Sequence, residues 1–165
     1  MPEAVQHPFA PLMCPESRIL ILGSFPSVRS REQQFYYGHP QNRFWPMLAA
    51  VYGAPVPVTT DEKTTLVFSH QLALWDCIAS CTITGSSDAS VRDVVPTDIR
   101  RVLDGAPIRR VLCNGALSGR MYRRYLEPVT GLPAIVMPST SPANAAWSLT
   151  RLVAVWGEAL RGDHL

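Results

Sequence analysis

The chain has 165 residues, of which 47% are apolar and 17% charged, the composition of one globular domain rather than of a disordered segment. Its formal net charge is only +2, so charge alone does not indicate a nucleic-acid-binding protein. No apolar run approaches the roughly 20 residues of a membrane helix. The N-terminus, "MPEAVQHPFAPL", lacks the pattern of a secretory signal. We therefore expect a single domain over residues 1–165 of a cytoplasmic protein, without membrane contact.

The four cysteines, Cys14, Cys77, Cys81 and Cys113, show neither a C-x-x-C motif nor the spacing of a zinc site. Cys77 and Cys81 are close enough along the chain to face an iron–sulfur cluster. Cys113, however, lies in an apolar, strand-like run, which favours buried and reduced thiols. We expect neither a metal ion nor an organic cofactor.

Prolines are frequent in residues 1–17, which we expect to form an extended N-terminal lead-in. The run "RILILGS" at 18–24 is continuously apolar and ends in glycine, a pattern typical of a strand buried on both faces. A long loop is expected over 25–42. A helix is expected over 43–53, with Pro46 tolerated in its first turn.

A second helix is expected after Thr59 or Thr60, since either residue can cap a helix whose first turn contains Asp61 and Glu62. The segment "LALWDCI" at 72–78 is a short strand candidate. The segment "TGSSDASV" at 84–91 is polar and predicts a loop.

The second half of the chain continues the alternation of helices and strands. A short helix is expected with Thr97 as its N-cap and Gly105 at its end. "RRVLCNG" at 109–115 predicts a buried strand that turns into a helix over 116–126. "PAIVMPS" at 133–139 predicts the fourth strand.

The last helix is expected over roughly 143–161, where apolar residues recur along one side. Strands that alternate with helices indicate a mostly parallel sheet covered on both faces. The sequence therefore predicts an α/β fold, a single three-layer α/β/α domain with a four-stranded central sheet. Ligands of such sheets bind beyond the carboxyl ends of the strands, where "GSFPS", "WDC", "NG" and "MPSTSPAN" follow the predicted strands.

The stretch "YYGHPQNRFW" at 36–45 combines aromatic faces with amide and guanidinium donors. These groups suit a flat ligand with polar edges, such as a nucleic-acid base. The turn "LGSFPSVRS" is neither a G-x-G-x-x-G nor a phosphate-binding Walker loop, and the chain contains no G-x-S-x-G elbow. Arg120, Arg123 and Arg124 stand at helical spacing and either contact phosphates or form a solvated helix face.

Together, "ILGSFPSVRS", "YYGHPQNRFW" and "MPSTSPANAAW" resemble the motifs of the uracil-DNA glycosylase superfamily, in the same order. The resemblance is closer to the hypoxanthine-DNA glycosylase branch, also called DNA-deoxyinosine glycosylases, and "ALWDCIASC" and "GSSDAS" also look like that branch. It spans about residues 18–150. It implies a uracil-DNA glycosylase-like fold and an enzyme that flips a deaminated base out of DNA and hydrolyses its N-glycosidic bond. Hypoxanthine is the expected base, and the enzyme is expected to be a monomer.

The resemblance also implies which residue handles the attacking water. Many superfamily members carry an asparagine or aspartate for this purpose at the third place of the first turn, where this chain has Phe25. In the branch that the chain resembles, the asparagine of the H-P-x-N run takes the role, and here that residue is Asn42. An amide positions and polarises a water but is no strong base. A plain helix cap is the alternative for Asn42.

Further residues are expected to bind the base. Tyr37 stands where mismatch-specific relatives stack a ring on the extruded base, although Tyr36 is an alternative platform. His39 contacts the base or a phosphate, or else stabilises its own loop. Asp76 either reads the base edge or caps a loop. Backbone N–H groups at Ser24 or Phe25 would stabilise the departing base anion.

The stretch "MPSTSPANAAW" resembles the superfamily motif that enters the minor groove and contacts phosphates. Ser139, Thr140 and Ser141 are therefore expected to bind DNA, and Asn144 either binds DNA or caps the last helix. Met137 replaces the histidine that opens this motif in the best-known uracil enzymes, which removes an imidazole from the expected chemistry.

Three alternatives remain open at the level of sequence. The first is a uracil or G/U mismatch-specific DNA glycosylase, and the second is a damaged-DNA-binding module without catalysis. The third is a small-nucleotide-binding α/β enzyme, which the lack of a phosphate-loop signature disfavours. Lys63 is the only lysine and lies in an ordinary predicted helix, which argues against Schiff-base lyase chemistry and for a monofunctional hydrolase.

Overall fold

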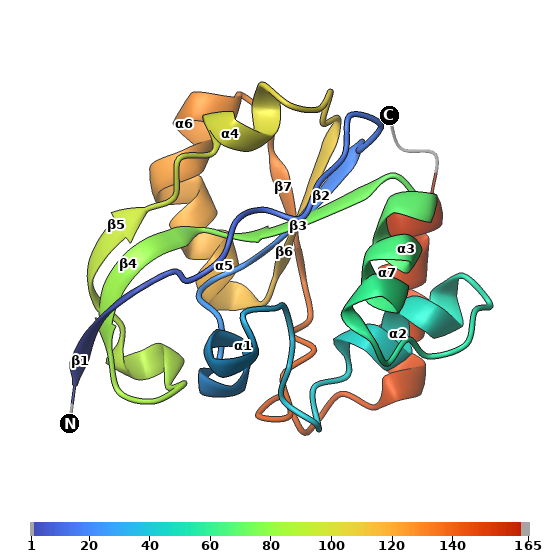
Figure 1. The fold of residues 1–165 in the computed structure, drawn as a ribbon, viewed down its shortest axis with the longest axis horizontal. Helices are drawn as coiled ribbons and strands as arrows, with labels where there is room; N and C mark the ends of the chain where they lie inside the picture. Colours follow the sequence, from blue (N-terminus) through green and yellow to red (C-terminus); the bar gives the residue numbers. More distant parts are fainter. Residues whose placement is uncertain (1, 163–165) are drawn as a thin grey trace.

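Four parallel strands form the central sheet of the computed structural model, which describes residues 2–162 (Figure 1). The sheet has the strand order β3-β2-β6-β7, and its strands are β2 (Ile19–Gly23), β3 (Leu72–Asp76), β6 (Arg110–Asn114) and β7 (Ala134–Met137). These are the four apolar runs from which the sequence predicted strands. The side chains of β2, β3 and β6 are buried on both faces, as the fully buried Leu20 and Leu112 illustrate, whereas Ile135 and Val136 of the edge strand β7 are exposed.

Helices cover both faces of this sheet and form the outer layers (Figure 1). On one face lie α2 (Phe44–Val51), α3 (Thr60–Ser69) and α7 (Leu149–Arg161). On the other lie α4 (Arg100–Leu103), α5 (Ala116–Met121), the π-helical segment η2 (Tyr122–Leu126) and α6 (Glu127–Thr130). The predicted three-layer α/β/α arrangement with a four-stranded sheet is confirmed.

A second, antiparallel sheet extends the molecule beside the parallel one, and the sequence patterns did not predict it. It has the order β1-β4-β5, with β1 at Glu3–Gln6, β4 at Ile78–Ile83 and β5 at Arg92–Pro96. The N-terminal lead-in thus supplies an edge strand. The chain leaves β3 at Asp76 and enters β4 two residues later. The predicted polar loop at 84–91 is the tip of the β4–β5 hairpin and contains a short 3₁₀ turn, η1 (Asp88–Ser90).

Three predictions about the helices are wrong. The expected loop over 25–42 contains a helix, α1 (Val28–Gln33), because the Ser27 hydroxyl accepts the Ser30 N–H and caps it. Thr97 does not cap α4; it is buried and its N–H donates to Cys77, so that the helix starts after Ile99. The last helix begins at Leu149, capped by Ser148, and not near residue 143.

The predicted starts of two other helices agree with the structure. Helix α2 follows Arg43 and carries Pro46 in its first turn. Helix α3 is capped by Thr59 in a complete capping box, because the Thr59 hydroxyl accepts the Glu62 N–H and the Glu62 carboxylate accepts the Thr59 N–H. These helices fix the segment between β2 and β3 against the sheet.

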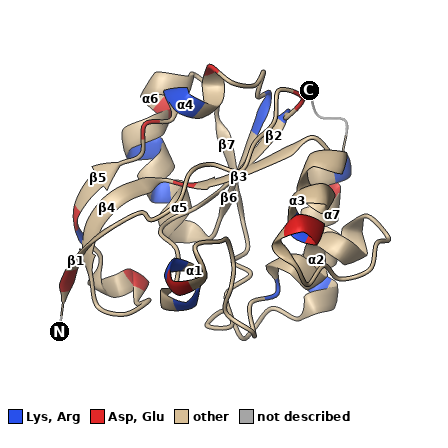
Figure 2. Cartoon of the chain, in the orientation of Figure 1, with Lys and Arg blue, Asp and Glu red and all other residues tan. Residues whose placement is uncertain are grey.

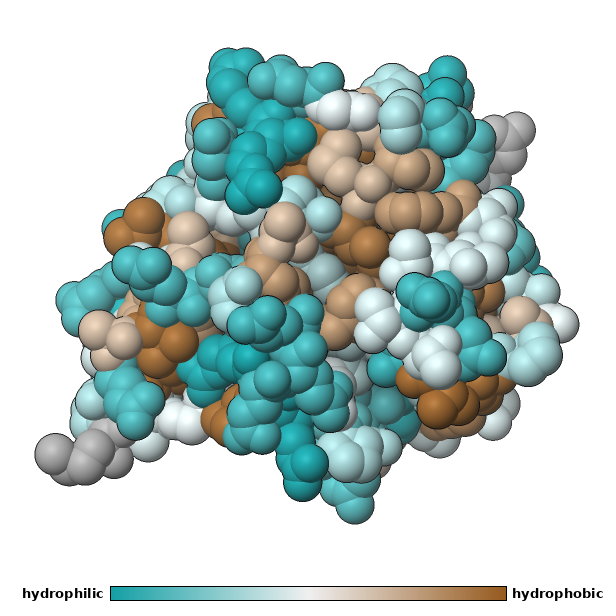
Figure 3. Space-filling model, viewed as in Figure 1, coloured by the Kyte–Doolittle hydropathy of each residue, from teal (hydrophilic) through white to brown (hydrophobic). Residues whose placement is uncertain are grey.

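The surface is mixed in both charge and hydropathy. Figure 2 shows lysines and arginines distributed over several elements, α1, α4 and α5 among them. Figure 3 shows apolar side chains on the same face in several separate patches between hydrophilic ones. Arg120, Arg123 and Arg124 are exposed along α5 and η2. None of the helices between residues 2 and 162 has the length and apolar character that a membrane crossing requires.

The four cysteines differ in their exposure to solvent. Cys77, Cys81 and Cys113 are buried, Cys14 is partly exposed, and all four thiols are free. Within the described residues no group of three or more His, Cys, Asp or Glu side chains could hold a metal ion. Burial raises the pKa of the Cys77 thiol, and it raises that of Cys113 to about 11.

Candidate active site

A cleft of about 360 Å³ lies at the carboxyl ends of the parallel strands. Its volume falls in the range of about 300–1,000 Å³ that is usual for small-molecule pockets. Turns after β2, β3, β6 and β7 contribute, together with the aromatic loop and the tip of the β4–β5 hairpin. The lining residues are Gly23, Ser24, Phe25, Pro26, Ser27, Ser30, Tyr36, Tyr37, Asn42, Asp76, Ser86, Ser87, Asp88, Asn114, Ser139, Thr140, Ser141 and Ala143.

Most of the residues selected from the sequence meet in this cleft. Eight of them line it: Ser24, Phe25, Tyr37, Asn42, Asp76, Ser139, Thr140 and Ser141. Two others do not line it. The His39 ring accepts the Gln41 N–H and so stabilises its own turn. The Asn144 amide donates to the Ser139 carbonyl and supports its own loop, several residues before the last helix begins.

The Asn42 amide is held by a hydrogen-bond chain that crosses between three loops. Its Oδ1 accepts the Phe44 N–H and the Thr140 hydroxyl, each at 2.9 Å. A backbone N–H only donates, so this contact fixes which end of the amide is the oxygen. Both lone pairs of Oδ1 are then in use. No described residue accepts from Nδ2, so the amino group is the end that Asn42 can offer to a ligand.

Thr140 and Asn114 continue the chain. Thr140 is fully buried, and its N–H and hydroxyl bond to the two ends of the Asn114 amide at 3.0 Å each. Asn114 stands at the end of β6, where the sequence indicated only a turn residue. Gly115 follows it with φ of 99°, which explains the glycine. The Asn42 amide is thus oriented by a rigid strand end.

Arg43 ties the second motif to the start of α2. Its guanidinium donates to the carbonyls of Trp147, Ser141 and Asn144, and its N–H donates to the Thr140 carbonyl. The planar guanidinium of Arg43 therefore fixes the loop that separates β7 from α7. These bonds explain why residues 143–148 form a loop and not the first turns of the helix.

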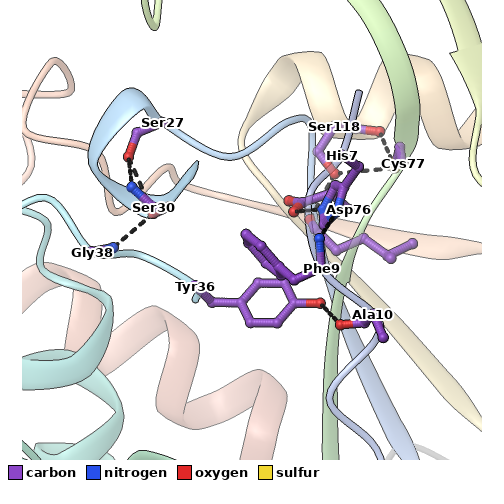
Figure 4. A network of polar contacts seen from close by, with 11 residues as sticks. His7, Phe9, Ala10, Ser27, Ser30, Tyr36, Gly38, Asp76, Cys77 and Ser118 are labelled. Atoms are coloured by element: carbon purple, nitrogen blue, oxygen red, sulfur yellow. Dashed lines mark hydrogen bonds and ion pairs between the residues drawn. The ribbon is translucent and has the colours of Figure 1, made fainter. Parts of the chain in front are cut away.

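The two neighbouring tyrosines have different environments. Tyr36 is buried, and its hydroxyl donates to the Ala10 carbonyl (Figure 4). Tyr37 stacks on Phe44 with ring centroids 4.1 Å apart, and it adopts φ of 55°. Its hydroxyl is buried and has no partner with hydrogen-bond geometry in the described part of the chain. Burial, and then the nearby Asp76 carboxylate, raises the pKa of Tyr37 far above its ordinary value, so the hydroxyl stays protonated.

Asp76 forms a buried pair with a residue that the sequence analysis did not select. The His7 Nε2 lies 2.7 Å from Asp76 Oδ2, and each side chain is only 5% exposed (Figure 4). His7 directly follows β1, and its ring is surrounded by Phe9, Phe25, Tyr36 and Trp75. The pair is invisible in sequence because His7 lies in the N-terminal lead-in and acquires its position only through the pairing of β1 with β4.

Two sets of hydrogen-bond donors belong to residues that line the cleft. Between residues 2 and 162, no group accepts the N–H of Ser24 or of Phe25, although both residues line the cleft. Ser139 and Ser141 each accept one backbone N–H, from Ser141 and Ala143, which leaves their own hydroxyl hydrogens free to donate. Both sets suit an anion or another hydrogen-bond acceptor in the cleft.

The hairpin tip brings a negative group to the same cleft. Ser86, Ser87 and Asp88 line it, and the tip is attached to α1 because the Val28 N–H donates to Ser86 and Arg31 donates to the Gly85 carbonyl. Partial removal from water raises the pKa of the Asp88 carboxyl, and the charge of Arg120 acts against this shift.

Comparison with known proteins places this site in a family. The family model for the uracil DNA glycosylase superfamily matches residues 10–160. A hypoxanthine DNA glycosylase of Methanosarcina acetivorans is 32% identical over 149 residues, which cover 89% of this chain and 93% of that protein. A hypoxanthine DNA glycosylase of Methanosarcina barkeri is 30% identical over 155 residues, which cover 93% of this chain and 96% of that protein.

A solved structure shares the fold. The solution NMR structure of a candidate uracil DNA glycosylase from Methanosarcina acetivorans superposes with a TM-score of 0.82 at 28% identity. The match covers 96% of this chain and 98% of that one.

Proposed function

Because the chain belongs to the uracil-DNA glycosylase superfamily, we propose that it is a DNA repair glycosylase that releases a deaminated base, with hypoxanthine as its preferred substrate. The observation that carries this proposal is the meeting of the sequence motifs in one cleft at the carboxyl ends of the strands. DNA is then the partner. The base enters the cleft only after it has left the helical stack, which costs a few kcal/mol.

Asn42 is the proposed catalytic residue. Its amino group donates to the oxygen of one water and holds that water near C1′ of the sugar. The C1′–N bond breaks first, its electron pair leaves with the base, and an oxocarbenium ion forms at the sugar. The water then bonds to C1′ and releases a proton to solvent. Because the attacked centre is a cation, a well-placed water suffices without a strong base.

The remaining contacts divide between the base and the DNA backbone. Phe25 and Tyr37 supply aromatic surface for the base, and Asp76 supplies an acceptor for its edge. The N–H groups of Ser24 and Phe25 stabilise the departing base anion. Ser139 and Ser141 donate to phosphates. Thr140 acts through Asn42, since its hydroxyl is committed to that amide.

Uracil is a second candidate substrate. It is favoured by the fold shared with the candidate uracil DNA glycosylase. The reaction and the residue roles would be the same.

A panel of oligonucleotides tests the proposal. Single- and double-stranded DNA that carries one hypoxanthine, uracil or xanthine would be incubated with the protein and then cleaved with alkali at abasic sites. We expect the fastest release from hypoxanthine, and no strand cleavage before alkali. Faster release from uracil would reverse the substrate preference. No release from any of the three would refute a glycosylase and favour a damage-binding module.

A further inference from the structure

We propose that His7 is a positioning residue that turns Asp76 into a fixed hydrogen-bond acceptor for the N–H group that deamination creates on a base. This inference rests on the proposed glycosylase function and adds a recognition step to it. It concerns a contact between the N-terminal segment and the end of β3, an edge strand of the parallel sheet.

The His7 ring has one arrangement that satisfies both of its nitrogens. Nδ1 faces the Phe9 N–H at 3.4 Å and therefore serves as the acceptor. The hydrogen then resides on Nε2, which donates to Asp76 Oδ2 at 2.7 Å. A carboxylate that is 5% exposed needs such a donor, because burial without one is costly. His7 thus donates to one oxygen of Asp76, Oδ2, and leaves the other, Oδ1, free to accept a hydrogen bond from a ligand.

The second oxygen, Oδ1, lies beside Gly23 at the end of β2. A Cβ placed on Gly23 would be 2.3 Å from Oδ1, so glycine is needed to leave room for the carboxylate, and it would be 3.4 Å from the Tyr37 hydroxyl, which is ordinary contact. The only side-chain hydrogen bond of Asp76 within residues 2–162 goes to Oδ2, and the Tyr37 hydroxyl has no partner with hydrogen-bond geometry in the same range. An acceptor and an unsatisfied hydroxyl therefore lie together in the cleft.

This pair of groups matches the edge of a deaminated base. Adenine N1 and cytosine N3 carry a lone pair, whereas hypoxanthine N1 and uracil N3 carry a hydrogen next to a carbonyl group. Asp76 Oδ1 would accept that hydrogen, and the Tyr37 hydroxyl would donate to the carbonyl oxygen. A carboxylate repels a lone pair, so adenine and cytosine are refused. Guanine and thymine also carry an N–H, so this contact does not exclude them.

The test compares two purines in duplex DNA under single-turnover conditions, hypoxanthine and the unsubstituted purine of deoxynebularine. The latter has the lone pair at N1 and lacks the 6-oxygen. The wild-type protein is expected to prefer hypoxanthine. His7→Phe keeps an aromatic ring among its neighbours but removes the donor, so the preference should fall by about 10-fold or more. His7→Gln retains an N–H donor and should restore most of it.

Asp76→Asn gives an independent test that does not depend on the folding of the His7 variants. The His7 N–H would hold the oxygen of the new amide, so that its NH₂ group faces the base. The preference should then shift toward the unsubstituted purine by about 10-fold or more. A merely structural role of His7 would slow both substrates alike.

The outcomes separate this inference from the proposed function. If His7→Phe and Asp76→Asn both keep the wild-type ratio of the two rates while they release hypoxanthine, the inference is wrong and the glycosylase stands. If the wild-type protein releases neither hypoxanthine nor uracil, the proposed function fails first.

Discussion

Asn42 illustrates how residues distant in sequence decide which end of an amide meets a ligand. The Phe44 N–H and the Thr140 hydroxyl both point at Oδ1, so the amide cannot turn over without loss of two hydrogen bonds. The sequence indicated Asn42 through its motif, but it could not indicate this orientation. Thr140 lies 98 positions away and was expected to contact DNA.

Thr140→Val tests that orientation. Valine has nearly the shape of threonine, yet it leaves Asn42 Oδ1 and the Asn114 amino group each short of one partner. We expect the rate of base release to fall by about 10-fold or more, and the free energy of unfolding to fall by about 1–3 kcal/mol. Single-turnover kinetics and urea unfolding measure the two effects. Thr140→Ser keeps the hydroxyl and serves as the control, and equal rates for Val and Ser would contradict the proposed role.

At the scale of elements, the loop between β7 and α7 owes its shape to Arg43. Apolar periodicity predicted a helix from residue 143, but three carbonyls of this loop are taken by the Arg43 guanidinium instead. Periodicity reads only neighbours along one helix and contains no information on a donor from another element. Helix α1 was missed for a different reason: its only buried residue is Ser30, so it has no apolar stripe that periodicity could detect.

Arg43→Lys should release this loop. A single ammonium group cannot reproduce a planar fork, so carbonyls of Ser141, Asn144 and Trp147 would lose their donor. We expect the free energy of unfolding to decrease by about 1.5–3 kcal/mol and the amides of residues 139–147 to exchange with solvent faster. Hydrogen-exchange mass spectrometry measures the second effect. Arg29→Lys, at an exposed position of α1, is the matched control. Unchanged hydrogen exchange of these amides in Arg43→Lys would contradict the role of Arg43 in holding the loop.

At the scale of the whole molecule, the parallel sheet was predictable and the antiparallel sheet was not. Strands β2, β3 and β6 are continuous apolar runs, which follow from burial on both faces. Strand β5 is mostly exposed and pairs with β4 through irregular register, so its sequence carries little apolar signal. The cleft followed from the parallel sheet, whereas His7 and the hairpin tip depend on the second sheet and could not be placed.

The distribution of the thiols gives a prediction for the entire fold. Burial raises the pKa of Cys77, Cys81 and Cys113, so these groups remain protonated and shielded at pH 8, while Cys14 is partly exposed. Iodoacetamide at pH 8 should modify Cys14 first, and denaturant should be required for the other three. Peptide mass spectrometry identifies the labelled residue. Rapid labelling of Cys77 or Cys113 in the native protein would contradict this packing.

The most direct test of the whole account is the single-turnover rate of hypoxanthine release by the wild-type protein and by Asn42→Ala, with DNA binding measured for both. The account expects similar binding and a rate that is lower by roughly 100-fold in the variant, because alanine cannot hold the attacking water near C1′. An Asn42→Ala protein that binds the same DNA and releases hypoxanthine at the wild-type rate would contradict the account.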